Sequence, residues 1–367
     1  MACDAVQLAV SGVQELQPYQ PGKPIEELER ELGIENSIKL ASNENPLGPS
    51  AKALAAAQDA LRQMTLYPDA LGFRLKKRLH EVYAIAPEQL TLGNGSNDLL
   101  ELITRVFVNP GEEVIYSQYA FIVYALVSRA AGAKSIEVPA VDYGHDLAAM
   151  ASAITPNTKL VFLANPNNPT GTAFTLDQLR QFLAQVPNST LVVLDEAYTE
   201  YVEDSRLPDG LKLLDEYNNL IVTRTFSKAW GLAGLRVGFA AASSQITDLL
   251  NRVRQPFNVN IPALVAAEAV LDDQDYLQRS VALNRAGLQQ LCTGLEALGA
   301  DYIPSYGNFV AVHFKDDAMP IYEALLRKGV IVRPLGIYKM PHHLRVSVGT
   351  ESENQRFLDA LIEVLNG

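Results

Sequence analysis

Cysteine is scarce in this chain, whose 367 residues contain only Cys3 and Cys292, with no CxxC pair. That scarcity excludes a disulfide framework and leaves no paired thiols for zinc, so we predict no metal site. Basic residues are also in deficit, since 30 Lys and Arg face 42 Asp and Glu, and the net charge of −12 argues against a nucleic-acid partner. The chain has no run of about 18 apolar residues and no basic, apolar leader in residues 1–12, so we predict no membrane partner and a cytoplasmic location.

Short apolar runs alternate with helical patterns through the middle of the chain. The runs cover residues 113–116, 134–138, 160–163, 191–194, 220–223 and 237–240. Several are apolar on both faces, which is typical of a mostly parallel sheet covered by helices, so we predict an α/β fold. Loops at the carboxyl ends of such strands are where we expect the functional site.

The chain is longer than one hydrophobic core usually supports, so we expect a large domain and a smaller one. After Pro256 a long helical tract is followed by apolar runs at 310–314, 330–332 and 344–348, with a helix near Leu325. This order predicts a small α+β domain. We place its connecting helix and strands in residues 256–367 and the large domain in 50–255, and we expect 1–49 to join the small domain or a neighbouring subunit.

The segment Thr225-Phe226-Ser227-Lys228 follows one of the apolar runs and lies shortly before Arg236. An amine that forms an imine must be reachable, with its pKa lowered by partial burial and nearby positive charge. Ser227 and Arg236 would supply a hydroxyl and a guanidinium for a phosphate group. A solvated loop lysine beside a surface arginine is the ordinary alternative for a Ser-Lys pair taken alone.

The run 191–194 ends abruptly in Asp195, with Tyr198 three residues further on. A carboxylate at such a strand end can pair with a protonated pyridine nitrogen, and a tyrosine hydroxyl could bond the ring oxygen. From this segment alone, a helix N-cap is an equally good explanation of Asp195.

Two further segments join a strand to a polar turn. In Asn165-Pro166-Asn167-Asn168-Pro169-Thr170-Gly171 the prolines fix the turn, so that Asn168 could present its amide to a ligand or could belong to a plain turn. In Gly93-Asn94-Gly95-Ser96-Asn97-Asp98 the turn opens a helix, whose free N–H groups at Gly95, Ser96 and Asn97 favour an anion. The second segment matches neither GxGxxG nor the Walker pattern, which disfavours dinucleotides and nucleoside triphosphates, while a capped helix without ligand remains open.

Taken in order, these segments resemble the fold-type I, aspartate-aminotransferase-like enzymes over nearly the whole chain, from about Tyr19 to the end. Residues 18–24, 40–49, 67–69 and 344–350 resemble more specifically the histidinol-phosphate aminotransferase family. The resemblance implies a large domain with a mostly parallel seven-stranded sheet, a smaller α+β domain, and pyridoxal 5′-phosphate as cofactor. It further implies a homodimer that works in L-histidine biosynthesis, with L-histidinol phosphate and L-glutamate or 2-oxoglutarate as substrates.

The resemblance also assigns roles to individual residues. Lys228 carries the cofactor and acts as the base, Asp195 contacts the pyridine nitrogen, and Tyr198 and Asn168 contact the ring oxygen. Tyr119 stacks on the ring, although this chain lacks the proline that many relatives have before the stacking aromatic, so Phe121 is the alternative. The cofactor phosphate is assigned to Ser96, Asn97, Ser227, Arg236 and, from the second subunit, Tyr67. Substrate binding is assigned to Tyr19, Asn43, Arg333 and Arg345.

Three other functions compete with this assignment. An aminotransferase of relaxed specificity for aromatic amino acids would use the same residues, because a guanidinium binds carboxylate as readily as phosphate. A decarboxylase of a phosphorylated amino acid would share most of the cofactor residues. A non-catalytic cofactor-binding regulator is disfavoured, since the chain is acidic and no helix-turn-helix segment precedes the domain.

Overall fold

The computed structural model describes residues 3–14, 16–18 and 22–366. Its largest element is a seven-stranded sheet in the order β2 (Leu90–Gly93), β8 (Gly238–Ala241), β7 (Leu220–Thr225), β6 (Leu191–Asp195), β5 (Thr158–Ala164), β3 (Glu113–Ser117) and β4 (Lys134–Val138). Only β8 runs against its neighbours, pairing antiparallel with β2 and β7, while the other pairs are parallel. The predicted mostly parallel α/β sheet is confirmed.

The strands of this sheet are buried on both faces because helices cover both. Along β6, Val192 and Leu194 belong to one hydrophobic core while Val193 belongs to the other, as the alternation of side chains along a strand requires. The first core is completed by helices α5 (Phe73–Tyr83), α8 (Leu147–Ser152), α9 (Leu176–Leu183) and α11 (Ile261–Leu271), and the second by α6 (Ser96–Phe107), α7 (Ile122–Ala130) and α10 (Ser244–Val253).

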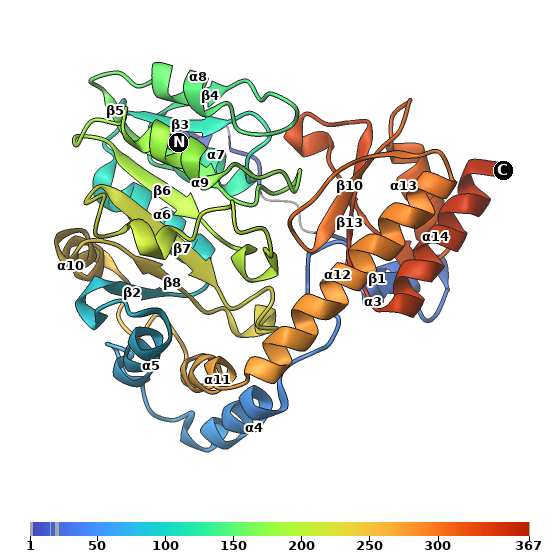
Figure 1. The fold of residues 1–367 in the computed structure, drawn as a ribbon, viewed down its shortest axis with the longest axis horizontal. Coiled ribbons are helices and arrows are strands. Elements are labelled where there is room, and N and C mark those ends of the chain that lie inside the picture. The colour runs from blue at the N-terminus through green and yellow to red at the C-terminus, as the bar shows by residue number, and fades with distance from the viewer. Residues whose placement is uncertain (1–2, 15, 19–21, 367) are drawn as a thin grey trace.

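The C-terminal part forms a smaller antiparallel sheet in the order β12 (Arg333–Pro334), β13 (His343–Ser347), β10 (Phe309–His313) and β9 (Asp301–Ile303). Helices α13 (Met319–Arg327) and α14 (Glu351–Asn366) accompany it, and the long helix α12 (Gln274–Ala297) runs from the large domain into it (Figure 1). Near the N-terminus, β1 (Ile38–Lys39) pairs in parallel with β11 (Val330–Ile331). The N-terminal segment thus adds a strand beside the small domain, while the exact domain bounds remain a prediction.

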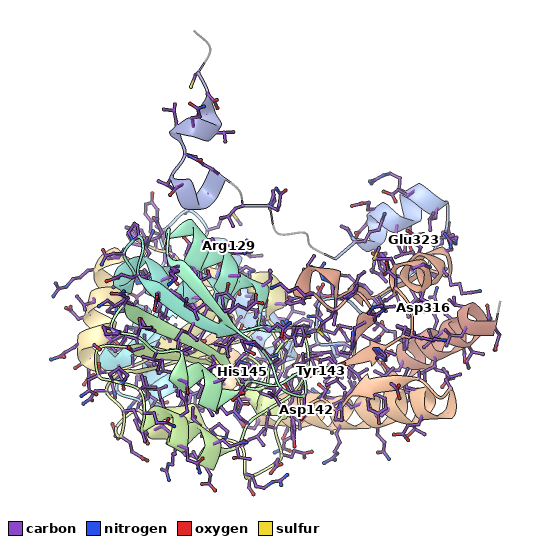
Figure 2. All side chains as sticks on the ribbon, turned by 90° about the horizontal axis from the view of Figure 1, so that it is seen from above. Arg129, Asp142, Tyr143, His145, Asp316 and Glu323 are labelled. Carbon is purple, nitrogen blue, oxygen red and sulfur yellow. The ribbon has the colours of Figure 1, made fainter. Side chains whose placement is uncertain are left out.

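The remaining elements are short. Helices α1 (Ala5–Leu8), α2 (Ser11–Gln14) and α3 (Ile25–Leu32) precede the residues predicted for the large domain, and α4 (Ala51–Ala60) lies at their start and contacts α11. The 3-10 helices are η1 (Leu61–Gln63), η2 (Pro87–Gln89), η3 (Thr199–Tyr201), η4 (Gly210–Leu213), η5 (Ala233–Leu235) and η6 (Gly336–Tyr338). Figure 2 shows α1 and α2 projecting from the body of the molecule near Arg129. Within the described residues, no helix is long and apolar enough to cross a membrane.

The helical tract expected after Pro256 is two helices. Helix α11 ends at Leu271, and α12 begins at Gln274, where the Asp273 side chain accepts a hydrogen bond from the backbone N–H of Tyr276. An aspartate in this position caps a new helix start, which explains the break.

Candidate active site

A cavity with about 960 Å³ of empty space, its open mouth included, lies where the carboxyl ends of β5, β6 and β7 face the small domain. Its walls come from the N-terminal segment, the large domain and the small domain. They bring together most of the predicted site residues: Asn43, Ser96, Asn97, Asn168, Asp195, Tyr198, Ser227, Lys228, Arg236, Arg333 and Arg345. Segments far apart in the sequence therefore meet at the edge of the sheet where parallel strands place ligand sites.

Two of the predicted residues that the structure describes, Tyr67 and Tyr119, are not among those walls. Tyr19 lies outside the described residues. Tyr67 is exposed and stacks on Phe257, with 4.6 Å between ring centroids. Tyr119 packs instead against Tyr143, which Figure 2 shows near the junction of the two domains.

Phe121, the alternative to Tyr119, does line the cavity. It is the N-cap residue of α7, so the start of that helix fixes which aromatic side chain faces the cavity. The geometry therefore favours Phe121 over Tyr119, while the residue that stacks on the cofactor remains a prediction.

Lys228 lies just beyond β7, and its Nζ donates to the carbonyl oxygen of Ser42 at 3.1 Å. Burial, helped by the positive charge of Arg345, lowers the pKa of Lys228 from 10.5 to about 7. A substantial fraction of this amine is therefore neutral at neutral pH, as a nucleophilic or basic lysine requires.

Asp195 is the last residue of β6 and is 5% exposed. Its Oδ2 accepts a hydrogen bond from the Tyr124 hydroxyl at 2.8 Å, and its Oδ1 accepts one from the Thr223 hydroxyl at 2.9 Å. Burial raises the pKa of Asp195, while these two hydrogen bonds and the charge of Lys228 oppose the rise. A buried carboxylate of this kind suits a cationic partner such as a protonated ring nitrogen.

Tyr124 was not predicted from the sequence, because it lies in a helical stretch whose apolar spacing indicates an ordinary core residue. Its ring does pack in the core, stacked on Phe162 with 4.6 Å between centroids, and only its hydroxyl reaches the site.

The start of α6 and Arg236 together form an anion-binding region. Gly95 has φ of 85°, and a Cβ at this position would lie 2.5 Å from Nη2 of Arg236, so the glycine lets the guanidinium approach the helix end. Arg236 also donates from Nη1 to the Ser227 hydroxyl at 3.3 Å. Helix N–H groups, a hydroxyl and a guanidinium fit a phosphate group.

Tyr198 and Asn168 are each held by a side chain from another part of the chain. Asn43 donates from Nδ2 to the Tyr198 hydroxyl at 2.9 Å. Arg345 donates from Nη1 to Oδ1 of Asn168 at 2.5 Å, which leaves the amide nitrogen of Asn168 as the end that can donate to a ligand.

Arg333 and Arg345 are directly opposite each other on β12 and β13, and both are buried. Arg345 donates from Nη2 to the Ala41 carbonyl oxygen at 2.7 Å, and its guanidinium lies 5.3 Å from the centre of the Phe309 ring. Like charges opposite each other on neighbouring strands repel, and an anion bound beside them relieves that repulsion. The cavity thus has a second anion-binding region, supplied by the small domain.

Residues 35–361 match the family model for class I and II aminotransferases, and the chain therefore belongs to that family. Among its relatives is histidinol-phosphate aminotransferase 2 of Pseudomonas fluorescens, which is 56% identical over 367 residues and covers 100% of this chain and 99% of the relative. The enzyme of the same name from Pseudomonas aeruginosa is 57% identical over 364 residues, covering 99% of each.

A solved structure is similar over nearly its full length. The crystal structure of histidinol-phosphate aminotransferase from Sinorhizobium meliloti in complex with pyridoxal-5′-phosphate gives a TM-score of 0.90 at 30% identity, covering 97% of each chain. The family membership and fold expected from the sequence motifs are confirmed, whereas the roles of single residues remain predictions.

We predict that Arg345→Gln raises the pKa of Lys228 from about 7 toward the ordinary value of 10.5, because it removes a repelling positive charge. The pH dependence of Lys228 acylation in the cofactor-free protein, followed by mass spectrometry, measures this pKa. Arg252→Gln, which removes an exposed arginine on α10, is the matched control. An unchanged midpoint in the Arg345 variant would contradict the prediction.

Proposed function

We propose that this chain is a pyridoxal 5′-phosphate-dependent aminotransferase that interconverts L-histidinol phosphate and 2-oxoglutarate with imidazole-acetol phosphate and L-glutamate. The observation that carries the proposal is one cavity that joins Lys228 and Asp195 to two separate anion-binding regions. The names of relatives that are 56% and 57% identical over nearly the full chain support the choice of substrate.

The residues present fit the cofactor. When bound, it supplies an aldehyde that condenses with amines and a ring that withdraws electrons from the α-carbon of an amino acid. Its phosphate is assigned to the region formed by Ser96, Asn97, Ser227 and Arg236. Asp195 is assigned to the ring nitrogen, Tyr198 and Asn168 to the ring oxygen, and Phe121 to one face of the ring.

Lys228 is the residue that moves the proton. Because its pKa is lowered to about 7, its Nζ can accept a proton and return it with little cost in either direction near neutral pH. Burial keeps the amine away from bulk water, so the proton stays available for return.

Arg333 and Arg345 serve both substrates in turn. A guanidinium presents paired N–H donors that match the oxygens of a carboxylate and of a phosphate equally well. The same pair can therefore bind the phosphate of histidinol phosphate in one half-reaction and a carboxylate of glutamate in the other. Asn43 lines the same cavity, and the assignment of Tyr19 to the substrate pocket remains a prediction.

The active unit that we propose is a homodimer. Tyr67 is 81% exposed, and around it along the chain lie other exposed apolar side chains, namely Leu61, Met64, Leu66, Leu71 and Phe73. An apolar surface of this kind favours association with a partner, and the partner subunit's Tyr67 would then reach the cofactor phosphate. A cytoplasmic location suits this biosynthetic role and remains a prediction.

Replacing Lys228 by Ala should abolish the near-visible absorption of the lysine-bound cofactor and lower turnover by about a thousandfold, because the attachment amine and the base are lost together. Absorption spectra and steady-state rates check this, and circular dichroism tests whether the fold is kept. Asp195→Ala should retain some cofactor but lose most of the turnover rate, because the ring nitrogen would lose its carboxylate partner. A wild-type spectrum in the Lys228 variant would refute the assignment.

With the wild-type enzyme, we expect kcat/KM for histidinol phosphate to exceed that for phenylalanine by about a hundredfold or more, because only the former places a phosphate beside the two arginines. Comparable values for the two would instead identify an aminotransferase of relaxed aromatic specificity. Release of carbon dioxide without formation of a keto acid would identify a decarboxylase. Each result separates one reaction from the others.

In solution the chain should sediment at twice its own mass of 40.1 kDa. Leu66→Glu should shift it toward the monomer and weaken cofactor retention, since a charge would be buried in the proposed interface. Leu365→Glu, at an exposed leucine on α14, is the control and should remain dimeric. A wild-type protein that sediments as a monomer would overturn the dimer proposal.

A further inference from the structure

The loops that follow β6 and β7 lie side by side because these strands are parallel neighbours, with Asp195 in register with Thr223. The β6 loop carries Tyr198 and, two residues later, Glu200 in the 3-10 helix η3. The β7 loop carries Lys228 and, two residues later, Trp230. Each loop therefore has one residue on the active-site cavity and another residue close behind it.

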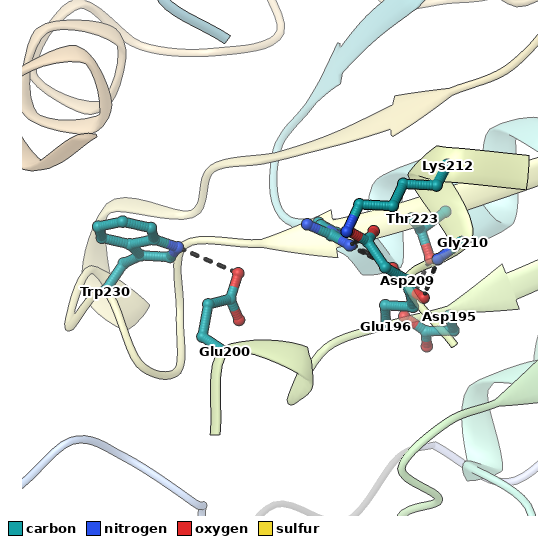
Figure 3. A network of polar contacts seen from close by, with 9 residues as sticks. Asp195, Glu196, Glu200, Asp209, Gly210, Lys212, Thr223 and Trp230 are labelled. Atoms are coloured by element: carbon teal, nitrogen blue, oxygen red, sulfur yellow. Dashed lines mark hydrogen bonds and ion pairs between the residues drawn. The ribbon is translucent and has the colours of Figure 1, made fainter. Parts of the chain in front are cut away.

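The two residues behind the cavity are bonded to each other. Trp230 donates from its indole Nε1–H to Oε1 of Glu200 at 3.1 Å, as Figure 3 shows. The indole is 3% exposed and packs on Phe226, with 6.3 Å between ring centroids. Both partners line a second cavity, with about 770 Å³ of empty space when its open mouth is included. Its lining shares no residue with that of the active-site cavity, so neither partner is placed to touch substrate.

We propose that Glu200 is a positioning residue for Lys228. Its hydrogen bond to Trp230 fixes the β7 loop against the β6 loop, and so fixes Nζ of Lys228 relative to Tyr198. This inference rests on the function proposed above and deepens it, because it assigns a role to a residue outside the cavity that holds substrate and cofactor.

The compact form of the β7 loop explains how the effect reaches the lysine. The backbone N–H of Gly231 donates to the carbonyl oxygen of Lys228 at 3.0 Å, and the backbone N–H of Leu232 donates to the carbonyl oxygen of Phe226 at 2.9 Å. Lys228 and Trp230 are thus parts of one closed turn, and a shift of the indole moves the lysine as well. The Nζ of Lys228 lies 5.8 Å from the centre of the Tyr198 ring, a spacing that such a shift would change.

Other contacts hold different parts of this region. Asn45 donates to the carbonyl oxygen of Ala229 at 3.0 Å, which ties the turn to the N-terminal segment. Arg224 donates to Glu196 at 2.7 Å and thus joins β7 to the residue directly after β6. Further from the sheet, the bond between Glu200 and Trp230 joins the two loops to each other.

The surroundings of Glu200 make this bond sensitive to charge. Burial, with a smaller contribution from the negative charge of Glu196, raises the pKa of Glu200 to about 7, while Arg224 and the indole N–H oppose the rise. Tyr83 from α5 and Asp209 line the same cavity. The other carboxylate oxygen, Oε2, has no hydrogen-bond partner among the described residues, so the indole is a principal contact of this carboxylate. A hydrogen bond to an ionised carboxylate is stronger than one to its neutral form.

The chain contains a single tryptophan, so one indole N–H resonance in a nitrogen-15 spectrum reports on Trp230 alone. In the cofactor-free protein we expect Glu200→Leu to shift this resonance and speed its exchange with solvent. In Glu200→Gln the amide oxygen can still accept the bond, so the resonance should stay protected, and it should lack the pH dependence near neutrality that we expect of the wild type.

In the cofactor-bound protein we expect Glu200→Leu and Trp230→Phe to shift the pH midpoint of the lysine-bound chromophore and to lower kcat by about tenfold, with KM changed by less than about twofold. Glu200→Gln should restore most of kcat. Glu203→Gln alters an exposed glutamate on the same loop, ion-paired with Arg285, and is the matched control that should behave as wild type.

A wild-type midpoint and kcat in both Glu200→Leu and Trp230→Phe, despite a shifted indole resonance in the former, would overturn the positioning role. Should Glu200→Leu fail to fold, Trp230→Phe alone decides the question, since it removes the donor and keeps an aromatic ring. The chromophore midpoint needs the lysine and the cofactor but no substrate. A shifted midpoint in a protein that does not act on histidinol phosphate would therefore reject the proposed substrate and keep the positioning role.

Discussion

The carboxylate of Asp195, buried at the end of a strand that is apolar on both faces, is the constraint on which the rest of the site depends. Helices on both sides of the sheet exclude water from β6, so its terminal acid must be satisfied by protein or ligand. The hydroxyls of Tyr124 and Thr223 provide two hydrogen bonds but no charge. In the proposed function a cationic ring nitrogen would supply that charge, and the neighbouring loops would place Lys228 and Tyr198 around the same ligand.

In the proposed function each of the two domains binds one anionic group. The large domain offers the start of α6 with Arg236, and the small domain offers Arg333 and Arg345 on adjacent strands. The N-terminal segment lies between them: Ser42 accepts from Lys228, and Ala41 accepts from Arg345. A ligand with a phosphate at one end and an anion at the other therefore contacts all three parts of the chain, which explains why such distant segments must fold together.

The sequence alone was sufficient to predict the apolar strands, the type of sheet and the polar residues at strand ends, because each of these depends on the pattern of neighbouring residues.

The sequence was not sufficient where the position of a side chain depends on where a helix starts or on the pairing of distant strands. Tyr119 and Phe121 are two residues apart, and only the start of α7 decides which of them faces the cavity. The opposition of Arg333 and Arg345 arises from the register of β12 and β13, and β12 is only two residues long. The rings of Tyr124 and Trp230 pack in the core, as aromatic residues in apolar segments usually do. Their polar atoms bond to Asp195 and Glu200, which lie far away in the sequence, so local sequence does not reveal these contacts.

Arg345, the arginine to which we assign substrate binding, also lowers the basicity of Lys228. Arg345 is the largest electrostatic contribution to the lowered pKa of Lys228, after burial itself. An anion bound to Arg345 offsets its positive charge, so the repulsion of a protonated Lys228 falls and the pKa of the amine rises. Without substrate the lysine is a weak base with a readily available neutral form, which suits attachment of an aldehyde. In the proposed function we therefore expect the pKa of Lys228 to rise from about 7 when substrate binds, so that binding and proton transfer would be coupled through one guanidinium.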